Sequence, residues 1–289
     1  MVTKVKTGIV FEGGAFRTIF SCGVMDALVE NDIMPDYMIG VSAGAAYGVS
    51  MASKLPRRNL DVLMKYRNDK RYLGLSNMID KDNKSIYGLE FSYETIPNEL
   101  NLFDYDAFKQ YKGDFYCVVT NLLTGQPEYM KYTGDDRTNT VLKATCALPM
   151  LFPPIIINDV PYMDGGLSDS IPYLKAIEDG CDRIIVVLTR QSGYTKTTSR
   201  STKAIAYSYR NQYPKLTETM LTRASRYNES LKGLDQYVKE GRIITIQPTT
   251  SKGFSRLEKD KNKILSMYND GYNQCYELLD TIKEFYGIK

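Results

Sequence analysis

The sequence predicts an α/β fold in which helices cover a mainly parallel sheet, and three features of the chain lead to this class. Residues 7–11 form a short apolar run that ends in a glycine-rich turn, and apolar residues with helical spacing follow from 18 to 30. Residues 36–41 repeat this order, with small residues opening the next helix at 43–46. A nearly continuous apolar run at 183–189 is typical of a parallel strand buried at the centre of a sheet. Repeated strand–turn–helix units are the pattern of a parallel sheet with covering helices.

The middle of the chain predicts a less regular part and then a return to strands. Residues 64–112 are rich in tyrosine and long for a connection, so we expect an insertion of helices and loops there. Strand-like runs at 114–121 and 128–132 flank a turn, which suggests a hairpin. The further elements expected are a helix at 136–147, a strand or hairpin at 155–163 and a helix at 171–179.

The last third of the chain follows a stretch rich in serine, threonine and lysine at 191–203, the best candidate for a linker. Beyond it we expect helices, one strand at 242–247 and a long terminal helix with an apolar stripe. The stripe comprises Leu265, Tyr268, Tyr272, Cys275, Leu279, Ile282 and Tyr286. Its short length and Gly271 within it favour docking on the parent domain over an intermolecular coiled coil. We therefore expect a core, 1–195, and a C-terminal extension packed on it, 196–289.

The chain has no histidine among its 289 residues. This excludes a Ser-His-Asp triad, a Cys-His pair and any metal site ligated by histidine. The five cysteines are odd in number and widely spaced, unlike a disulfide framework or a zinc site. We therefore expect a reducing compartment and no metal or organic cofactor.

The charge and hydropathy of the chain restrict the binding partners and the cellular location that we expect for the protein. The 37 lysines and arginines and 34 acidic residues form no block of like charge, so binding to nucleic acid has little support. The first residues lack the apolar core and cleavage site of a signal peptide, and no apolar stretch approaches the roughly 18 residues that span a bilayer. These features predict a soluble cytoplasmic protein.

A possible nucleophile elbow is the first chemical motif. Residues 40–44 read Gly-Val-Ser-Ala-Gly, in which Ser42 would occupy a sharp strand-to-helix turn and Gly40 and Gly44 would permit the tight backbone. The following helix would direct its N-terminal amides and the positive end of its dipole at the reaction centre. The ordinary alternative is a tight turn without chemistry, because glycine and serine also form such turns.

A second glycine-rich turn between a strand and a helix lies earlier in the chain, at residues 12–17, and contains Gly13, Gly14 and Ala15. Acyl transfer needs backbone amides aimed at the developing oxyanion, and consecutive small residues expose such amides. The alternatives are a nucleotide-phosphate loop or a plain turn, but neither the phosphate-loop pattern nor the dinucleotide fingerprint fits. Arg17 ends the turn, where it could brace the loop or attract an anionic head group.

A serine nucleophile needs a base, and without histidine the candidates are aspartate, glutamate or lysine. Asp164 stands at a predicted strand end before Gly165 and Gly166, where a carboxylate can be held tightly against another loop. Taken alone, Asp-Gly-Gly is more often a turn. Asp169 could compete for the role of base, although its position favours the N-cap of the next helix, with Ile171 and Pro172 beginning that helix.

Four motifs in this order make the sequence resemble the bacterial members of the patatin-like phospholipases. The motifs are Gly13-Gly14-Ala15-Phe16-Arg17, Gly40 to Gly44, the segment from Ala144 through Pro149 and Pro153 to Pro154, and Asp164-Gly165-Gly166. The resemblance covers about residues 6–190, and the part after 195 is similar to an extension found in some bacterial members. Ala15 replaces the usual third glycine of the first motif and Thr18 replaces the glycine that usually follows the arginine. The amide of residue 15 is thereby kept, but a positive φ is disfavoured.

The resemblance implies a three-layer α/β/α sandwich and a Ser-Asp dyad, with Ser42 as nucleophile and Asp164 as base. It implies an acyl-enzyme on Ser42, an oxyanion held by the amides of Gly13, Gly14, Ala15 and Ala43, and a lipid or phospholipid acyl ester as substrate. Two rivals remain: an acyltransferase that uses the same dyad with an alcohol acceptor, and a catalytically silent lipid-binding protein.

Tyrosines and basic residues suggest that the protein also contacts a membrane surface, because amphipathic rings and cations suit lipid head groups. The insertion contributes Tyr66, Tyr72, Tyr87, Tyr93, Tyr105 and Tyr111, and a later stretch contributes Arg200, Lys203, Tyr207, Tyr209, Arg210, Tyr213 and Lys215. The alternative is that many of the 23 tyrosines fill the core and that the basic helix is a solvated face.

Overall fold

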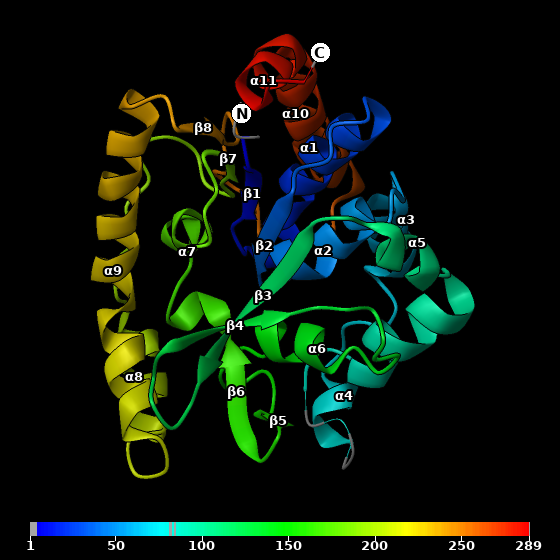
Figure 1. Ribbon diagram of the computed structural model, residues 1–289. Helices are drawn as coiled ribbons and strands as arrows, with labels where there is room; N and C mark the ends of the chain where they lie inside the picture. The colour runs from blue at the N-terminus through cyan, green and yellow to red at the C-terminus, as the bar shows by residue number, and fades with distance from the viewer. Residues whose placement is uncertain (1–4, 81–82, 84, 289) are drawn as a thin grey trace.

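The computed structural model describes residues 5–80, 83 and 85–288, and its centre is one mixed, mainly parallel sheet (Figure 1). The strand order is β5-β6-β3-β2-β1-β7-β8, with β4 also paired to β3. Neighbours along the path from β3 to β8 are parallel, whereas β4 and β6 run antiparallel to β3 and β5 runs antiparallel to β6. The strands are β1 Thr7–Phe11, β2 Tyr37–Val41, β3 Asp114–Asn121, β4 Pro127–Lys131, β5 Ile155–Ile157, β6 Val160–Asp164, β7 Arg183–Val187 and β8 Ile243–Ile246.

Helices cover both faces of this sheet, so the predicted α/β class and its covering layers are confirmed (Figure 1). One face carries α1 (Ile19–Glu30), α2 (Ala43–Ala52), α3 (Arg58–Tyr66), α5 (Tyr105–Gln110), α6 (Thr140–Cys146), α10 (Lys261–Glu277) and α11 (Leu279–Tyr286). The other carries α7 (Tyr173–Glu178) and α9 (Pro214–Lys239). Alternate residues of a central strand enter opposite cores: Ile185 faces the first group of helices, and Ile184 and Val186 face the second.

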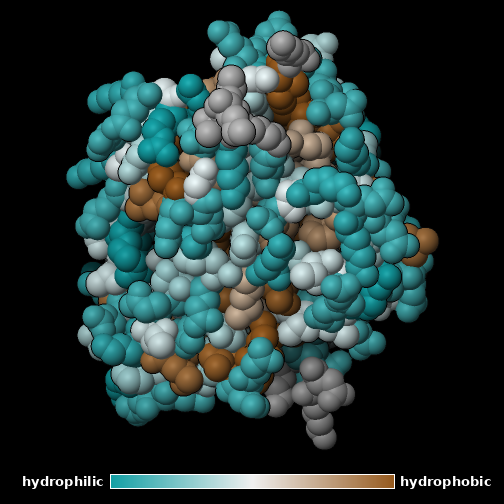
Figure 2. Space-filling model, viewed as in Figure 1, coloured by the Kyte–Doolittle hydropathy of each residue, from teal (hydrophilic) through white to brown (hydrophobic). Residues whose placement is uncertain are grey.

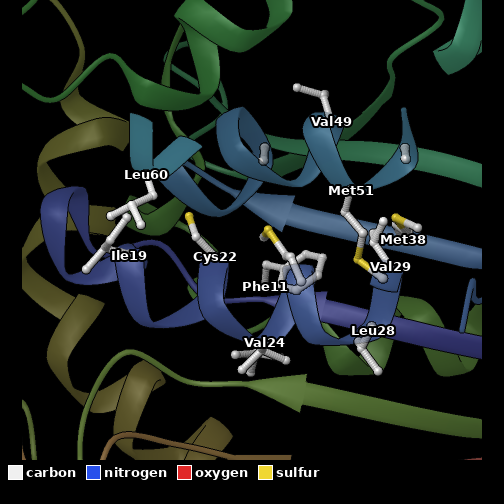
Figure 3. Packing of buried hydrophobic residues seen from close by; sticks show 14 of the residues in the cluster. Phe11, Ile19, Cys22, Val24, Leu28, Val29, Met38, Val49, Met51 and Leu60 are labelled. Atoms are coloured by element: carbon white, nitrogen blue, oxygen red, sulfur yellow. The ribbon is translucent and has the colours of Figure 1, made fainter. Parts of the chain in front are cut away.

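The core beneath α1 and α2 shows why the first two strand–helix units fold as they do (Figure 3). Phe11 of β1 and Met38 of β2 are fully buried in the same cluster as Cys22 of α1 and Met51 of α2. Cys22 is therefore a packing thiol, and burial raises its pKa well above the usual range.

The terminal helix packs on α1 through two glycines. A Cβ atom on Gly23 of α1 would lie 2.1 Å from the carbonyl oxygen of Tyr268, and one on Gly271 of α10 would lie 2.0 Å from that of Phe20. The hydroxyl of Tyr268 also donates a hydrogen bond of 2.7 Å to Asp26. Gly23 and Gly271 thus allow the two helices to approach closely. The apolar stripe that contains Gly271 faces the parent domain.

The region after residue 195 is also joined to the sheet, because β8 pairs in parallel with β7. Its first helices are α8 (Arg200–Ser208) and the long α9, which runs along the side of the molecule (Figure 1). The strand β8 therefore belongs to the same sheet as the strands that precede residue 195.

The expected insertion consists of α3, the short α4 (Ser76–Ile79), a π-helix η2 (Phe91–Leu100) and α5.

The helix expected at 136–147 is shorter than predicted. It begins at Thr140 because Asn139 has a φ of 53° and because the carboxylate of Asp136 accepts bonds from the amides of Thr138 and Thr140. A side chain that bonds nearby amides in this way competes with helix formation.

Candidate active site

Ser42 occupies a strained turn between β2 and α2. Its φ and ψ are 55° and −128°, a region that residues other than glycine rarely adopt. The turn is held by close backbone contacts, because a Cβ on Gly40 would lie 2.5 Å from the amide nitrogen of Ala45 and one on Gly44 would lie 2.5 Å from the carbonyl oxygen of Phe11. Residues 40–44 therefore have the backbone that a nucleophile elbow requires.

A threonine that the sequence did not single out fixes this turn from α6. The amide of Ser42 donates to Oγ1 of Thr145 at 2.9 Å, and that hydroxyl donates to the carbonyl of Val118 at 2.6 Å. Thr145 is fully buried and lies within the third motif, so its place in that motif was the only sequence signal for this role.

Asp164 ends β6 and brings its carboxylate to Ser42. The hydroxyl of Ser42 lies close enough to this carboxylate to lower its pKa, and Oδ1 of the carboxylate accepts the amide of Gly166 at 2.7 Å. The backbone of Asp164 is fixed on both sides, since its amide donates to Ala147 at 2.9 Å and its carbonyl accepts from Thr120 at 2.8 Å. The side chains predicted from two distant motifs are thus in direct contact.

The protonation of this pair depends mainly on burial. Asp164 is 2% exposed, and burial raises the pKa of its carboxyl above the ordinary aspartate range. The bond from Ser42, the charge of Arg223 and the amide of Gly166 oppose that shift. Nearby, burial raises the pKa of the Cys146 thiol to about 12, so the thiol stays protonated at neutral pH and is a poor nucleophile.

The glycine loop lies directly against the elbow. A Cβ on Gly13 would lie 2.8 Å from the Cβ of Ser42, so only glycine fits there. Ala15 begins the short 3-10 helix η1 (Ala15–Thr18) with a φ of 50°, which means that alanine adopts the conformation in which a glycine was expected. In the described part of the chain, the amides of Gly13, Gly14, Ala15 and Ala43 donate to no protein acceptor. These amides are free to bind an oxyanion.

Ser42 stands between two cavities of different character. The first, of about 130 Å³, is lined mainly by apolar and aromatic side chains, among them Phe16, Tyr72, Ile96 and Leu142. The second, of about 60 Å³, is lined by the glycine loop, Asp164 and basic side chains. An apolar chain suits the first cavity and a charged group suits the second.

The tyrosines of the insertion are not surface anchors. Tyr66, Tyr72 and Tyr105 are buried, and Tyr72, Tyr87 and Tyr93 line the apolar cavity. These rings therefore support the alternative, in which tyrosines fill the core, and give no support to a membrane interface.

Two further candidates have different surroundings from those expected. The carboxylate of Asp169 accepts the hydroxyl of Tyr129 at 3.0 Å and the amide of Ile171 at 3.2 Å, but α7 begins only after Pro172. Asp169 therefore closes a turn before the helix and is not its N-cap. Arg17 is 6% exposed and its Nε has no hydrogen-bond partner among the described residues, so bracing of the loop by hydrogen bonds is not observed.

Comparison with known proteins decides the family. A family model for patatin-like phospholipase matches residues 9–177, which include the glycine loop, the elbow and Asp164. The chain belongs to the patatin-like phospholipase family. Residues 213–287 match a second model, a domain of unknown function (DUF6363).

Relatives of the patatin-like region include proteins with and without an assigned activity. The chain is 26% identical to the uncharacterized protein YjjU of Escherichia coli over 196 residues, which cover 64% of this chain and 52% of YjjU. It is 29% identical to lysophospholipase nte1 of Aspergillus terreus over 193 residues, 63% of this chain and 12% of nte1. The matched region thus spans about half of YjjU and a small part of nte1. Among solved structures, VipD from Legionella pneumophila aligns with a TM-score of 0.46 and 15% identity over 96% of this chain and 67% of that chain.

Among the described residues, neither a metal-ion site nor a helix that could span a membrane is found. Among residues 5–80, 83 and 85–288, no cluster of cysteine, aspartate and glutamate side chains could hold a metal ion. Within the same residues, no helix is both long and apolar enough to cross a bilayer.

Proposed function

We propose that the protein is a serine acyl-ester hydrolase that cleaves a lipid or phospholipid acyl ester. The interaction between the hydroxyl of Ser42 and the carboxylate of Asp164 carries this proposal, since it brings a nucleophile to a buried base without an intervening histidine. The same interaction argues against a catalytically silent lipid-binding protein, in which the two side chains need not meet.

In the proposed mechanism, Asp164 accepts the hydroxyl proton as Oγ of Ser42 attacks the ester carbonyl. The amides of Gly13, Gly14, Ala15 and Ala43 stabilise the negative charge that develops on the carbonyl oxygen. Asp164 then gives the proton to the departing alcohol, which leaves an acyl group on Ser42. A water molecule, deprotonated by the same carboxylate, hydrolyses this acyl-enzyme and restores the hydroxyl.

The apolar cavity supports a lipid as the source of the acyl group. It opens beside Ser42 and is lined by Tyr47, Val62, Ile96, Leu142 and Phe152 among others. Placing an acyl chain in this cavity would remove apolar surface from water at about 25 cal/mol per Å², which favours esters of extended fatty acids over those of short acids.

We also propose that the enzyme works in the cytoplasm and contacts the inner membrane surface. All five cysteines are buried and unpaired, as a reducing compartment allows. The exposed side chain of Met150 lies against Ser208 of the basic helix α8, whose Tyr207 is also exposed, and apolar residues appear at the lower edge of the molecule in Figure 2. The amide of Met150 donates to Tyr209 just after α8, which connects the two segments.

A total lipid extract tests the proposed reaction. Wild type, Ser42→Ala and Ser92→Ala proteins would each be incubated with the extract, and the lipids compared by mass spectrometry. Ser92 lines the same apolar cavity and has no hydrogen-bond partner among the described residues, so it is a matched control. We expect particular acyl esters to disappear, and free fatty acids to appear, with wild type and Ser92→Ala only. Added alcohols would yield new esters if the enzyme is an acyltransferase. Loss of the same lipids with Ser42→Ala would contradict the proposal.

A further inference from the structure

Five basic side chains meet in the second cavity beside Ser42. They are Arg17, Arg190, Lys196, Arg223 and Arg256. The acidic side chains lining the same cavity are Glu12 and Asp164, so the lining has a formal surplus of three positive charges. The chain as a whole has a net charge of only +3, which means that this concentration of charge is local.

The two carboxylates in this cavity already have other partners. Glu12 accepts the amide of Thr189 at 2.6 Å and the hydroxyl of Tyr227 at 3.0 Å. Asp164 accepts bonds from Ser42 and from the amide of Gly166. Neither carboxylate forms an ion pair within 4.0 Å with a basic side chain of the described residues.

The basic groups therefore lack ion-pair partners among the described residues, although Arg17 is buried and Arg190, Lys196 and Arg223 are half-buried; Arg256 is exposed. The Nε atoms of Arg17 and Arg223 are fully enclosed, yet neither has a hydrogen-bond acceptor in the described part of the chain. The ammonium of Lys196 lies 3.7 Å from the ring centre of Tyr227. The guanidinium of Arg190 lies 4.5 Å from the ring centre of Tyr194 and 3.4 Å from the hydroxyl of Ser251. Buried donors without acceptors are costly, so the arrangement is that of a site built for an anion.

Burial and mutual repulsion of the basic groups also indicate a site for an anion. Burial and the charge of Arg223 lower the pKa of Lys196 to about 7, and burial and the charges of Arg190 and Arg256 lower the pKa of Arg17 to about 10. Each shift means that the charged form is less stable here than in water. A bound anion would reverse that penalty.

We propose that this cluster binds the phosphate group of the ester substrate and selects substrates whose phosphate is not followed by a cationic amine. The inference rests on the proposed hydrolase function and names its substrate class. The substrate is an acyl ester whose alcohol part carries a phosphomonoester group. Guanidinium groups match phosphate oxygens in geometry and charge, whereas an added ammonium would be repelled by the surplus of positive charge.

The position of Ser42 gives this selection a geometric basis. The serine lines both cavities, as do Ala15 and Leu148. An acyl chain in the apolar cavity and a phosphate in the basic cavity would place the ester bond between them, next to Ser42. The two ends of one substrate would then fix the position of the reacting carbonyl.

Two of the five basic groups come from the region that matches the domain of unknown function. Arg223 lies on α9, and Arg256 lies in the loop before α10. The carbonyl of Arg256 accepts the amide of Phe16 at 3.1 Å, which fixes this loop to the glycine loop. The inference thus gives the C-terminal region a role, because it completes the anion-binding side of the active site.

Three esters with one acyl chain, kept below the concentration at which they aggregate, test the selection. They are a 1-acyl-glycerol 3-phosphate, the corresponding acyl-glycerophosphocholine and the monoacylglycerol. We expect kcat/KM to be highest for the first. In Arg256→Gln and Lys196→Gln, the ratio of its kcat/KM to that of the monoacylglycerol should fall about tenfold or more. Arg210→Gln, which removes an exposed arginine next to α8, is the matched control and should keep the wild-type ratio.

Binding to Ser42→Ala separates this inference from the proposed reaction. Titration calorimetry would compare the acylated glycerol phosphate with inorganic phosphate and with the monoacylglycerol. Tight binding of the acylated phosphate that weakens with salt and with Arg256→Gln would support the subsite, even if no ester were hydrolysed by wild type. Hydrolysis with equal rates on all three esters, unchanged in the variants, would overturn the subsite and leave the hydrolase proposal intact. Equal affinity for inorganic phosphate and the acylated phosphate would contradict the assignment to a substrate head group.

Discussion

The hydroxyl of Ser42 lies beside the carboxylate of Asp164 and lowers its pKa, in a chain that contains no histidine. Asp164 ends β6 and Ser42 follows β2, and β3 lies between these two strands. The contact therefore depends on the tertiary fold.

Replacing Asp164 by asparagine keeps the shape of the side chain but removes the ability to accept a proton. We expect turnover to fall by roughly 10³ to 10⁶, close to the loss in Ser42→Ala, and the double variant to be little worse than either single one. Steady-state rates of the four proteins on one ester measure this. Losses that add in the double variant would show that the two residues act independently.

The pH dependence of the reaction should reflect the burial of Asp164. The base works only when ionised, and a raised pKa means that the proton leaves only at higher pH. The acid limb of the kcat/KM profile should therefore lie above the ordinary aspartate range of about 4. Arg223→Gln removes a charge that lowers this pKa, so the limb should move to still higher pH. An acid limb that stays in place in Arg223→Gln, as it should in Arg210→Gln, would contradict this coupling.

Thr145 should contribute to the stability of the elbow. Thr145→Val keeps the shape of the side chain but leaves the amide of Ser42 without its acceptor, at a cost of about 1–3 kcal/mol in the free energy of unfolding. Thr145→Ser retains the hydroxyl and should lose clearly less. Urea denaturation of both variants measures the difference, and equal stability of the two would refute the role assigned to the hydrogen bond.

The crossing of α1 and α10 should tolerate no side chain at its two glycines. Gly23→Ala and Gly271→Ala each place a Cβ atom within about 2 Å of a backbone oxygen, so the helices must separate, and each change should destabilise by at least about 1–3 kcal/mol. Ser266→Ala changes an exposed residue of α10 and is the control for helix propensity. Thermal denaturation measures all three, and wild-type stability of both glycine variants would contradict the packing.

Contact with a membrane should depend on charge. Basic residues of α8 together with exposed apolar side chains are expected to bind anionic vesicles more strongly than neutral ones, and salt should weaken that binding. Vesicle flotation at low and high salt measures this, with Lys203→Glu as the variant and Lys239→Glu, at the far end of α9, as its control. Binding that is the same for neutral and anionic vesicles, or the same in the two variants, would contradict the proposed contact.

Local patterns predicted much of the fold and the centre of the site. The runs that became β1, β2 and β7 carry their signal within a few residues, as do the turns at Gly13 and Ser42. The beginning of α6 was missed because the carboxylate of Asp136 bonds nearby amides in place of the helix. Such competition is decided by side-chain geometry, which periodicity does not describe.

Features that depend on distant residues were the hardest to predict. The basic cluster draws Arg17, Arg190 and Arg256 from three separate parts of the chain. Arg17 ends the glycine-rich motif, where an anionic head group was one alternative, but no motif around Arg190 or Arg256 marks an anion site. The tyrosines of the insertion left a membrane interface and a filled core as open alternatives, because their composition suits both. Only the packing between the insertion and α2 distinguishes the two.

Covalent labelling tests the proposed nucleophile most directly. Wild type, Ser42→Ala, Asp164→Asn and Ser92→Ala would be treated with a fluorophosphonate, and the modified peptide identified by mass spectrometry. We expect one label per chain, on Ser42, in wild type and Ser92→Ala, with no label in Ser42→Ala and much slower labelling in Asp164→Asn. A label on another serine that persists at the same rate in Ser42→Ala would contradict Ser42 as the nucleophile.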